Sequence, residues 1–325
     1  MLARMYMNAR VSDLRSESGR TNFLILGLGG PKNEPSGLTD TIIFASVDHT
    51  GDLPAGRQAE VLLLSVPRDI WIPEMRAKIN SSYYYGNRAE GLGLEWARRY
   101  AGQVVGQPIH YVVVISFEGF EDLVDVLGGV DVVVDRGFTD TQYPVPGREA
   151  DLCGNDPELR CRYETVTFAT GSAHFDGKTA LKFVRSRQSM GEEGSDFARS
   201  NRQQKVILAL KQKMLVPGFY LNSEKLGQVL GIVVRSVETD IPESHFAALG
   251  KLALVSQKAK IDNQVIGFDA TNSGFLRNPP ISPQYDNQWV LLPRGGGWAA
   301  VQAWVSCLLK GNNCPAEEFT QAIKD

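Results

Sequence analysis

The sequence has no excess of positive charge, with 34 Lys+Arg against 37 Asp+Glu and a formal net charge of -3. A general polyanion-binding surface needs such an excess, so we expect no nucleic-acid partner, and any anion site must be local. No apolar run is long enough to cross a bilayer. The polar residues 1–20 lack the apolar core of an intact signal peptide. Two interpretations stay open: a cytoplasmic chain, or one whose membrane anchor is missing or truncated.

Cysteine is also scarce, with four in 325 residues. Cys153 and Cys161 bracket GNDPELR, and Cys307 and Cys314 bracket LLKGNN. Such short, turn-rich spacings suit disulfide-closed loops. Zinc is the alternative, but neither pair has C-x-x-C spacing, and His174 is the only histidine near the first pair. We expect two disulfides, which indicate an oxidising, extracytoplasmic compartment.

Several catalytic signatures are missing. The chain has no G-x-S-x-G, and its four histidines lie in unrelated contexts, which disfavours serine and cysteine hydrolases. The stretch GLGGPKNEPSGLTDT is rich in glycine but matches neither G-x-G-x-x-G nor a P-loop. The glycine content alone is therefore weak evidence for a ligand site.

What the sequence does contain is alternating strand and helix patterns. The apolar runs 22–30, 41–48 and 59–69 are typical of strands covered on both faces. Further strands are predicted at 109–117, 130–135 and 264–269, and helices at 91–106, 118–129, 196–215, 221–237, 244–256 and 299–309. Residues 171–184 are predicted to form a turn followed by a helix. This alternation favours an α/β fold.

Charged residues crowd into VRSRQSMGEEGSDFARSNRQQK, residues 184–205. Arg185 and Arg187 follow an apolar segment, and their spacing places both guanidinium groups on one side of an extended chain. Arg199, Arg202 and Gln203 share one face of the next predicted helix. This pattern predicts a local anion site rather than a solvated charged helix face.

Polar residues also follow the predicted strands, where α/β sheets usually build their sites. Arg68 in SVPRD could clamp a phosphate or pair with Asp69. Asp40 in LTDT could bind a hard cation or form a turn. Lys78 and Asn80 in KINSSYYYG supply donors beside three tyrosines, which could also pack on the core.

Six motifs then occur in order: LTDTIIFASVD, SVPRDIWIP, KINSSYYYG, GFEDLVDVLGGVDVVVD, FDGKTALKFVRSR and DFARSNRQQKVI. Together they resemble the LytR-CpsA-Psr family of bacterial cell-envelope phosphotransferases, over roughly residues 22–214. The ordered combination is specific, although each piece alone is weak. The resemblance implies a three-layer α/β/α fold with a central mixed sheet. The tail is a small C-terminal strand-helix extension by composition, because residues 271–298 are rich in Pro, Gly and Asn and a predicted helix follows them. We expect a polar linker over 1–20, the catalytic domain over 21–258 and the extension over 259–325.

The resemblance also implies an activity: transfer of a glycopolymer phosphate from a polyprenyl-pyrophosphate carrier to a peptidoglycan hydroxyl. The expected partners are the lipid-linked glycan, peptidoglycan and the cell membrane, with the protein outside the cytoplasm. A hydrophobic cavity would take the polyprenyl tail. The catalytic residues would be Arg68, Arg185, Arg187, Asp196 and Arg199. The residues that line the entrance of this cavity and bind the substrate would be Lys78, Asn80, Arg202 and Gln203.

The family also implies Mg²⁺, with Asp40 as a ligand. Many members end the first strand with an Asp that shares the metal, and here that position is Gly29. This departure weakens the expectation of a metal site. It also keeps two other functions open: a non-catalytic binder of polyprenyl lipids, and a pyrophosphatase that releases phosphate to water.

Overall fold

The chain divides into two units in the computed structural model. The first contains residues 1–117 and 236–325, and the second contains residues 118–235. The structure describes residues 9–29, 37–49, 60–148, 150–220, 222–268, 274–321 and 323. In these described residues, no helix is both long and apolar enough to cross a membrane.

A six-stranded sheet organises the first unit, in the order β11-β6-β1-β2-β3-β12. Its strands are β1 (Arg20–Leu28), β2 (Thr39–Asp48), β3 (Glu60–Ser65), β6 (Tyr111–Ser116), β11 (Val237–Thr239) and β12 (Lys260–Val265). The pairs β1–β6 and β3–β12 are parallel and the other pairs are antiparallel, so the sheet is mixed, as predicted. Strand β12 begins earlier than the predicted strand 264–269, and it places the start of the predicted extension inside the central sheet.

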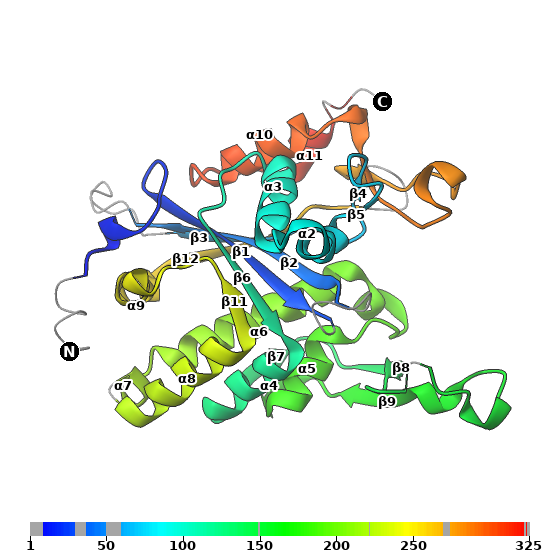
Figure 1. Cartoon of the computed structure of the whole chain (residues 1–325), viewed down its shortest axis with the longest axis horizontal. Coiled ribbons are helices and arrows are strands. Elements are labelled where there is room, and N and C mark those ends of the chain that lie inside the picture. Colours follow the sequence, from blue (N-terminus) through cyan, green and yellow to red (C-terminus); the bar gives the residue numbers. More distant parts are fainter. Residues whose placement is uncertain are drawn as a thin grey trace. The chain divides into compact units, whose positions relative to one another are not determined.

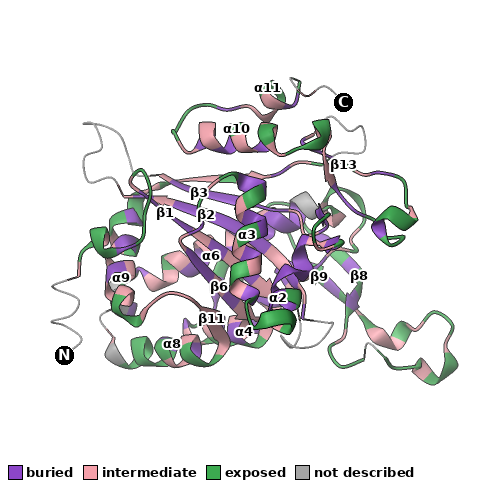
Figure 2. Ribbon diagram, turned by 45° about the horizontal axis from the view of Figure 1, so that its top comes forward, coloured by how far each residue is buried: buried purple, intermediate pink, exposed green. Residues whose placement is uncertain are grey.

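Helices cover both faces of this sheet, which explains why its strands are almost continuously apolar (Figures 1 and 2). On one face, Leu24 and Phe44 pack in a core shared with helices α3 (Gly93–Val105) and α10 (Ala299–Leu308). On the other face, Tyr111 packs with α9 (Phe246–Val255). The predicted three-layer α/β/α architecture is confirmed. Smaller elements of this unit are α2 (Ser82–Glu90), α11 (Ala316–Thr320), β4 (Trp71–Ile72), β5 (Ala77–Lys78), β13 (Leu276–Arg277) and β14 (Leu292–Pro293).

The second unit combines helices with two small two-stranded sheets. The helices are α4 (Phe117–Val126), α5 (Gly177–Arg185), α6 (Asp196–Met214), α7 (Pro217–Tyr220) and α8 (Ser223–Ser236). The sheets pair β7 (Val130–Val134) with β10 (Gly171–Phe175), and β8 (Phe138–Pro144) with β9 (Tyr163–Phe168). The prediction of a turn over the start of 171–184 was wrong, because β10 forms there and pairs in register with β7. The ring centroids of Phe138, Phe168, Phe175 and Phe183 lie 5.0–6.0 Å from their neighbours and form an aromatic core.

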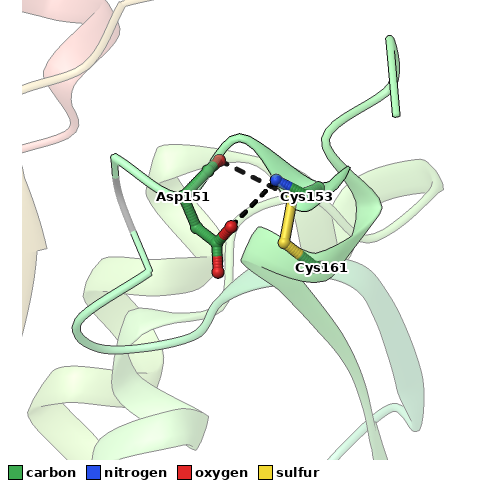
Figure 3. Close-up of side chains that lie close together, drawn as sticks. All are labelled: Asp151, Cys153 and Cys161. Carbon is green, nitrogen blue, oxygen red and sulfur yellow. Dashed lines mark hydrogen bonds between the residues drawn. A yellow bond between two sulfur atoms is a disulfide. The ribbon is translucent and has the colours of Figure 1, made fainter. Parts of the chain in front are cut away.

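Both predicted disulfides are present, joining Cys153 to Cys161 and Cys307 to Cys314. The first closes the loop at the end of the β8–β9 hairpin, where Asp151 accepts a 2.8 Å hydrogen bond from the Cys153 amide (Figure 3). Asp151 and the two sulfur atoms lie close enough to resemble a metal group. Because the sulfurs are bonded to each other, they offer no thiolates to zinc, and the zinc alternative is not supported.

We therefore expect a thiol reagent to find almost no free cysteine in denatured, unreduced protein. After reduction, the same titration should find four thiols, the full cysteine content of the chain. Two or more free thiols before reduction, in protein purified from an oxidising compartment, would contradict the pairing and the compartment inferred from it.

Candidate functional site

Four of the predicted site residues meet at one place in the first unit. Asp40 lies near the start of β2, Arg68 follows β3, and Lys78 ends β5. The Nη1 atom of Arg68 donates to Oδ1 of Asp40. The backbone amide of Asn80 donates to the Arg68 carbonyl over 3.3 Å. The side chains of Asp40, Arg68 and Lys78 keep 38%, 20% and 22% of their surfaces exposed, so solvent and small ligands reach the cluster.

Asp69 holds this cluster together. Its side chain is only 8% exposed, and its Oδ1 accepts a 2.6 Å bond from Nζ of Lys78. Its Oδ2 lies 3.5 Å from Nε of Arg68. Two roles were open for Arg68 from the sequence: binding a phosphate, or pairing with Asp69. In the structure Arg68 contacts both Asp40 and Asp69, and this fixes its guanidinium without closing it off from solvent.

Among the described residues of this cluster, both carboxylates, Asp40 and Asp69, are paired with basic side chains. A Cβ atom on Gly29 would lie 3.1 Å from Oδ2 of Asp40, so Gly29 occupies the place where a second carboxylate would face the first. Asp40 is paired with Arg68, and the nearby Asp69 is paired with Lys78. Magnesium binding therefore stays a prediction.

This arrangement predicts a gain of metal binding in Gly29→Asp. The new carboxylate would face Asp40 and supply the second oxygen ligand that magnesium sites commonly use. We expect calorimetry to detect tighter magnesium binding to Gly29→Asp than to the parent protein. Gly29→Asn is the matched control, because it has the same shape without the charge. Equal magnesium affinities for the parent protein and Gly29→Asp would contradict this interpretation of the site.

Arg185 and Arg187 lie in the second unit, at the exit of α5. Asp176 caps the start of this helix by accepting from the Thr179 amide, and Arg185 is its last residue. Both arginines are half-buried. Nη1 of Arg185 lies 3.3 Å from the Tyr143 hydroxyl, and its guanidinium carbon lies 5.5 Å from the centre of that ring. Burial raises the pKa of Tyr143, so the hydroxyl stays neutral beside the arginine.

Arg202 was predicted to contact substrate, but its hydrogen bonds point into the protein. Its side chain is 4% exposed. It donates to the carbonyls of Phe183, Ser186 and Glu193 over 3.0, 2.6 and 3.0 Å, and to the Glu193 carboxylate over 2.7 Å. Its guanidinium carbon lies 4.5 Å from the centre of the Phe138 ring. Burial lowers the pKa of Arg202, although arginine remains charged in proteins. This geometry favours a positioning role for Arg202.

Asp140 is a second anchor, which the sequence analysis missed. It is 1% exposed, and its Oδ2 accepts from the amides of Arg187 and Gln188 over 3.0 and 3.3 Å. Its Oδ1 accepts from the amide of Gln142 over 3.0 Å. FTDTQYP contains four polar residues in succession, 139–142, which is typical of a solvent-exposed segment. No local signal marked this carboxylate as buried and bonded to the arginine-bearing segment.

The remaining predicted residues lie on α6. Arg199 is 7% exposed, and Nε2 of Gln203 donates to the Val184 carbonyl over 3.5 Å. Asp196 opens the helix, but its side chain lies outside the described residues. Since Arg202 and Gln203 both bond to the backbone of 183–186, helices α5 and α6 bring Arg185, Arg187 and Arg199 onto adjoining stretches of chain.

A cavity of about 600 Å³ also lies in the second unit, between α6 and β7. Of the twelve described residues that line it, six are charged: Asp135, Arg136, Glu192, Glu193, Arg202 and Lys205. These six form three ion pairs, Arg136–Glu192, Arg202–Glu193 and Lys205–Asp135. A cavity with this lining does not suit an isoprenoid chain, and the apolar lipid cavity stays a prediction.

Solved structures with similar folds support this architecture. Protein gbs0355 from Streptococcus agalactiae aligns with a TM-score of 0.62 at 20% identity, over 92% of this chain and 90% of that one. TagV from B. subtilis aligns with a TM-score of 0.60 at 22% identity, over 91% and 99%. TagT bound to LI-WTA aligns with a TM-score of 0.56 at 17% identity, over 89% and 90%.

The sequence comparisons agree. The polyisoprenyl-teichoic acid–peptidoglycan teichoic acid transferase TagU of Bacillus anthracis is 24% identical over 270 residues, which are 82% of this chain and 75% of that protein. The TagU of Oceanobacillus iheyensis is 25% identical over 234 residues, 71% and 62%. The sequence model of the LytR_cpsA_psr family matches residues 4–276. With most of its length matched, the chain belongs to the LytR_cpsA_psr family.

Proposed function

We propose that this protein moves a glycopolymer phosphate from a polyprenyl-pyrophosphate carrier to a hydroxyl of peptidoglycan. Family membership and the teichoic acid transferase names of its relatives support the class of reaction. The relative TagT, solved bound to LI-WTA, supports a glycopolymer as the substrate. The paired cysteines favour action outside the cytoplasm, where disulfides persist. Association with the cell membrane is part of this proposal.

The observation that carries the proposal is the fixed segment that bears Arg185 and Arg187. Asp140, Arg202 and Gln203 bond to its backbone, which fixes the segment that carries the two half-buried arginine side chains. A diphosphate concentrates negative charge, and the planar guanidinium of an arginine can donate hydrogen bonds to two phosphate oxygens at once. Phosphoryl transfer depends mainly on positioning and on stabilising charge, so a rigid arginine segment suits it.

The proposed reaction is a displacement at phosphorus. The acceptor hydroxyl oxygen forms a bond to the glycan-side phosphorus, and the bond between that phosphorus and the bridging oxygen breaks. Polyprenyl phosphate leaves with the bonding electron pair, and the hydroxyl proton passes to a base, for which Asp196 is the predicted residue. Arginines beside the leaving phosphate stabilise the charge that it gains.

Incubation with a short-chain polyprenyl-pyrophosphate glycan, with and without peptidoglycan, tests the proposal. We expect labelled glycan to become attached to peptidoglycan and polyprenyl phosphate to be released in equal amounts. Tight binding without turnover would replace the proposal with a lipid-binding role, for which the missing carboxylate at Gly29 is the motivating observation. Hydrolysis at the same rate without peptidoglycan would identify a pyrophosphatase.

A further inference from the structure

We propose that a surface pocket in the first unit binds a hexopyranose ring of the glycan substrate. The proposal rests on the proposed function for the identity of the glycan, but none of the predicted site residues is among the described residues that line the pocket. Its volume is about 470 Å³. The lining residues are Glu74, Met75, Tyr85, Arg88, Ala89 and Trp96.

Three elements build this pocket, and they lie together in Figure 1. The turn between β4 and β5 supplies Glu74 and Met75, helix α2 supplies Tyr85 and Arg88, and α3 supplies Trp96. The same turn continues directly into β5, whose last residue, Lys78, belongs to the predicted cavity entrance. A ligand held in the pocket is therefore contacted by the chain segment that carries Lys78.

Two aromatic rings make the apolar part of the pocket. Tyr85 is 42% exposed although it lies on a helix with a buried face. Trp96 is half-buried, and its indole rests against Gly86 of α2: a Cβ atom there would lie 2.8 Å from Cγ of Trp96. Only glycine permits this contact, so the tryptophan ring is held in place before any ligand arrives. Fixed, partly exposed rings can cover the apolar C–H face of a sugar.

The polar groups select the class of ligand. Arg88 donates to the Tyr84 hydroxyl over 2.9 Å, which holds its guanidinium at the pocket. Glu74, which is exposed, supplies a carboxylate of opposite charge. A carboxylate and a guanidinium in the same pocket favour a neutral ligand rich in hydroxyl groups, since hydroxyls both donate and accept hydrogen bonds. An anionic ligand would be repelled by the Glu74 carboxylate, and a quaternary ammonium group would be repelled by the Arg88 guanidinium.

Calorimetric titration of the full chain tests the assignment without requiring turnover. The probes are a peptidoglycan tetrasaccharide of alternating N-acetylglucosamine and N-acetylmuramic acid, and the short-chain donor glycan. We expect Tyr85→Ala to weaken binding of one probe roughly three- to tenfold, the range for an aromatic contact. Tyr163→Ala is the matched control, because Tyr163 is also 42% exposed and lies on β9. It should leave both affinities unchanged.

The probe that responds identifies the source of the sugar, acceptor or donor, and either response supports the pocket. Equal affinities of the parent protein and Tyr85→Ala for both probes would overturn the assignment, as would failure of the parent protein to bind either. Tyr85-dependent binding in a protein that transfers no glycan would leave the pocket in place and remove the proposed function. If the protein transfers glycan normally but Tyr85→Ala binds both probes as tightly as the parent protein, the proposed function stands and the pocket assignment is removed.

Discussion

Replacing Arg187 with alanine should reduce glycan transfer by about 10²–10³-fold or more and leave the fold intact. Its side chain is half-buried, and its backbone amide stays bonded to Asp140 whatever the side chain. The variant should therefore lose activity because the diphosphate is less stabilised, and not because the protein packs less well. Turnover of the lipid-linked glycan, measured beside thermal unfolding, separates the two effects.

Two further variants sharpen this experiment. Arg187→Lys keeps the charge but loses the planar fork, so it should recover only part of the activity. Arg160→Ala removes an arginine whose side chain is 76% exposed and should have no effect. Near-normal turnover by Arg187→Ala would refute the assignment of this residue to the diphosphate.

Replacing Arg202 should produce the second large effect, by another route. Arg202→Ala leaves three backbone carbonyls and the Glu193 carboxylate without their donor. Removing one partner of a buried charged group commonly costs about 3–5 kcal/mol, so we expect a marked loss of stability. Under conditions where the variant is still folded, kcat should fall because the segment carrying Arg185 and Arg187 is no longer fixed.

Asp140→Asn provides a comparison that disturbs the same segment from the other side. An asparagine keeps the shape but has one acceptor oxygen in place of two, so the amides of Gln142, Arg187 and Gln188 can no longer all be bonded. We expect kcat to fall in this variant too, with little change in substrate affinity. If Arg202→Ala instead raised KM and left kcat unchanged, Arg202 would be a direct substrate contact, as the sequence first indicated.

The sequence predicted the central sheet well because its strands are buried on both faces and therefore stand out as apolar runs. It also predicted the helices near 91–106, 196–215 and 299–309, which the structure places at α3, α6 and α10. The β8–β9 hairpin escaped notice because its strands are rich in polar residues, with four in succession in FTDTQYP. Short, half-exposed strands give a weak pattern.

Site residues were found by type and spacing, and their roles depended on burial. Arg202 belongs to the same charged window as Arg199, yet its hydrogen bonds are made to the protein interior. Asp140 is far from that window in sequence and reaches it only through the fold. Gly29 was expected beside Asp40 from the family resemblance, and the pairing of β1 with β2 does bring the two residues together.

The order of strands also affects how the molecule must fold. Strand β6 ends at Ser116, and its neighbour β11 begins only at Val237, after the whole second unit. Pairing of Val237 with Ile115 is thus a late event that closes a very long loop, and such distant contacts slow folding. During synthesis at the ribosome, the first unit stays incomplete until the inserted residues have emerged, and its exposed strand edge must be shielded from other chains during that interval.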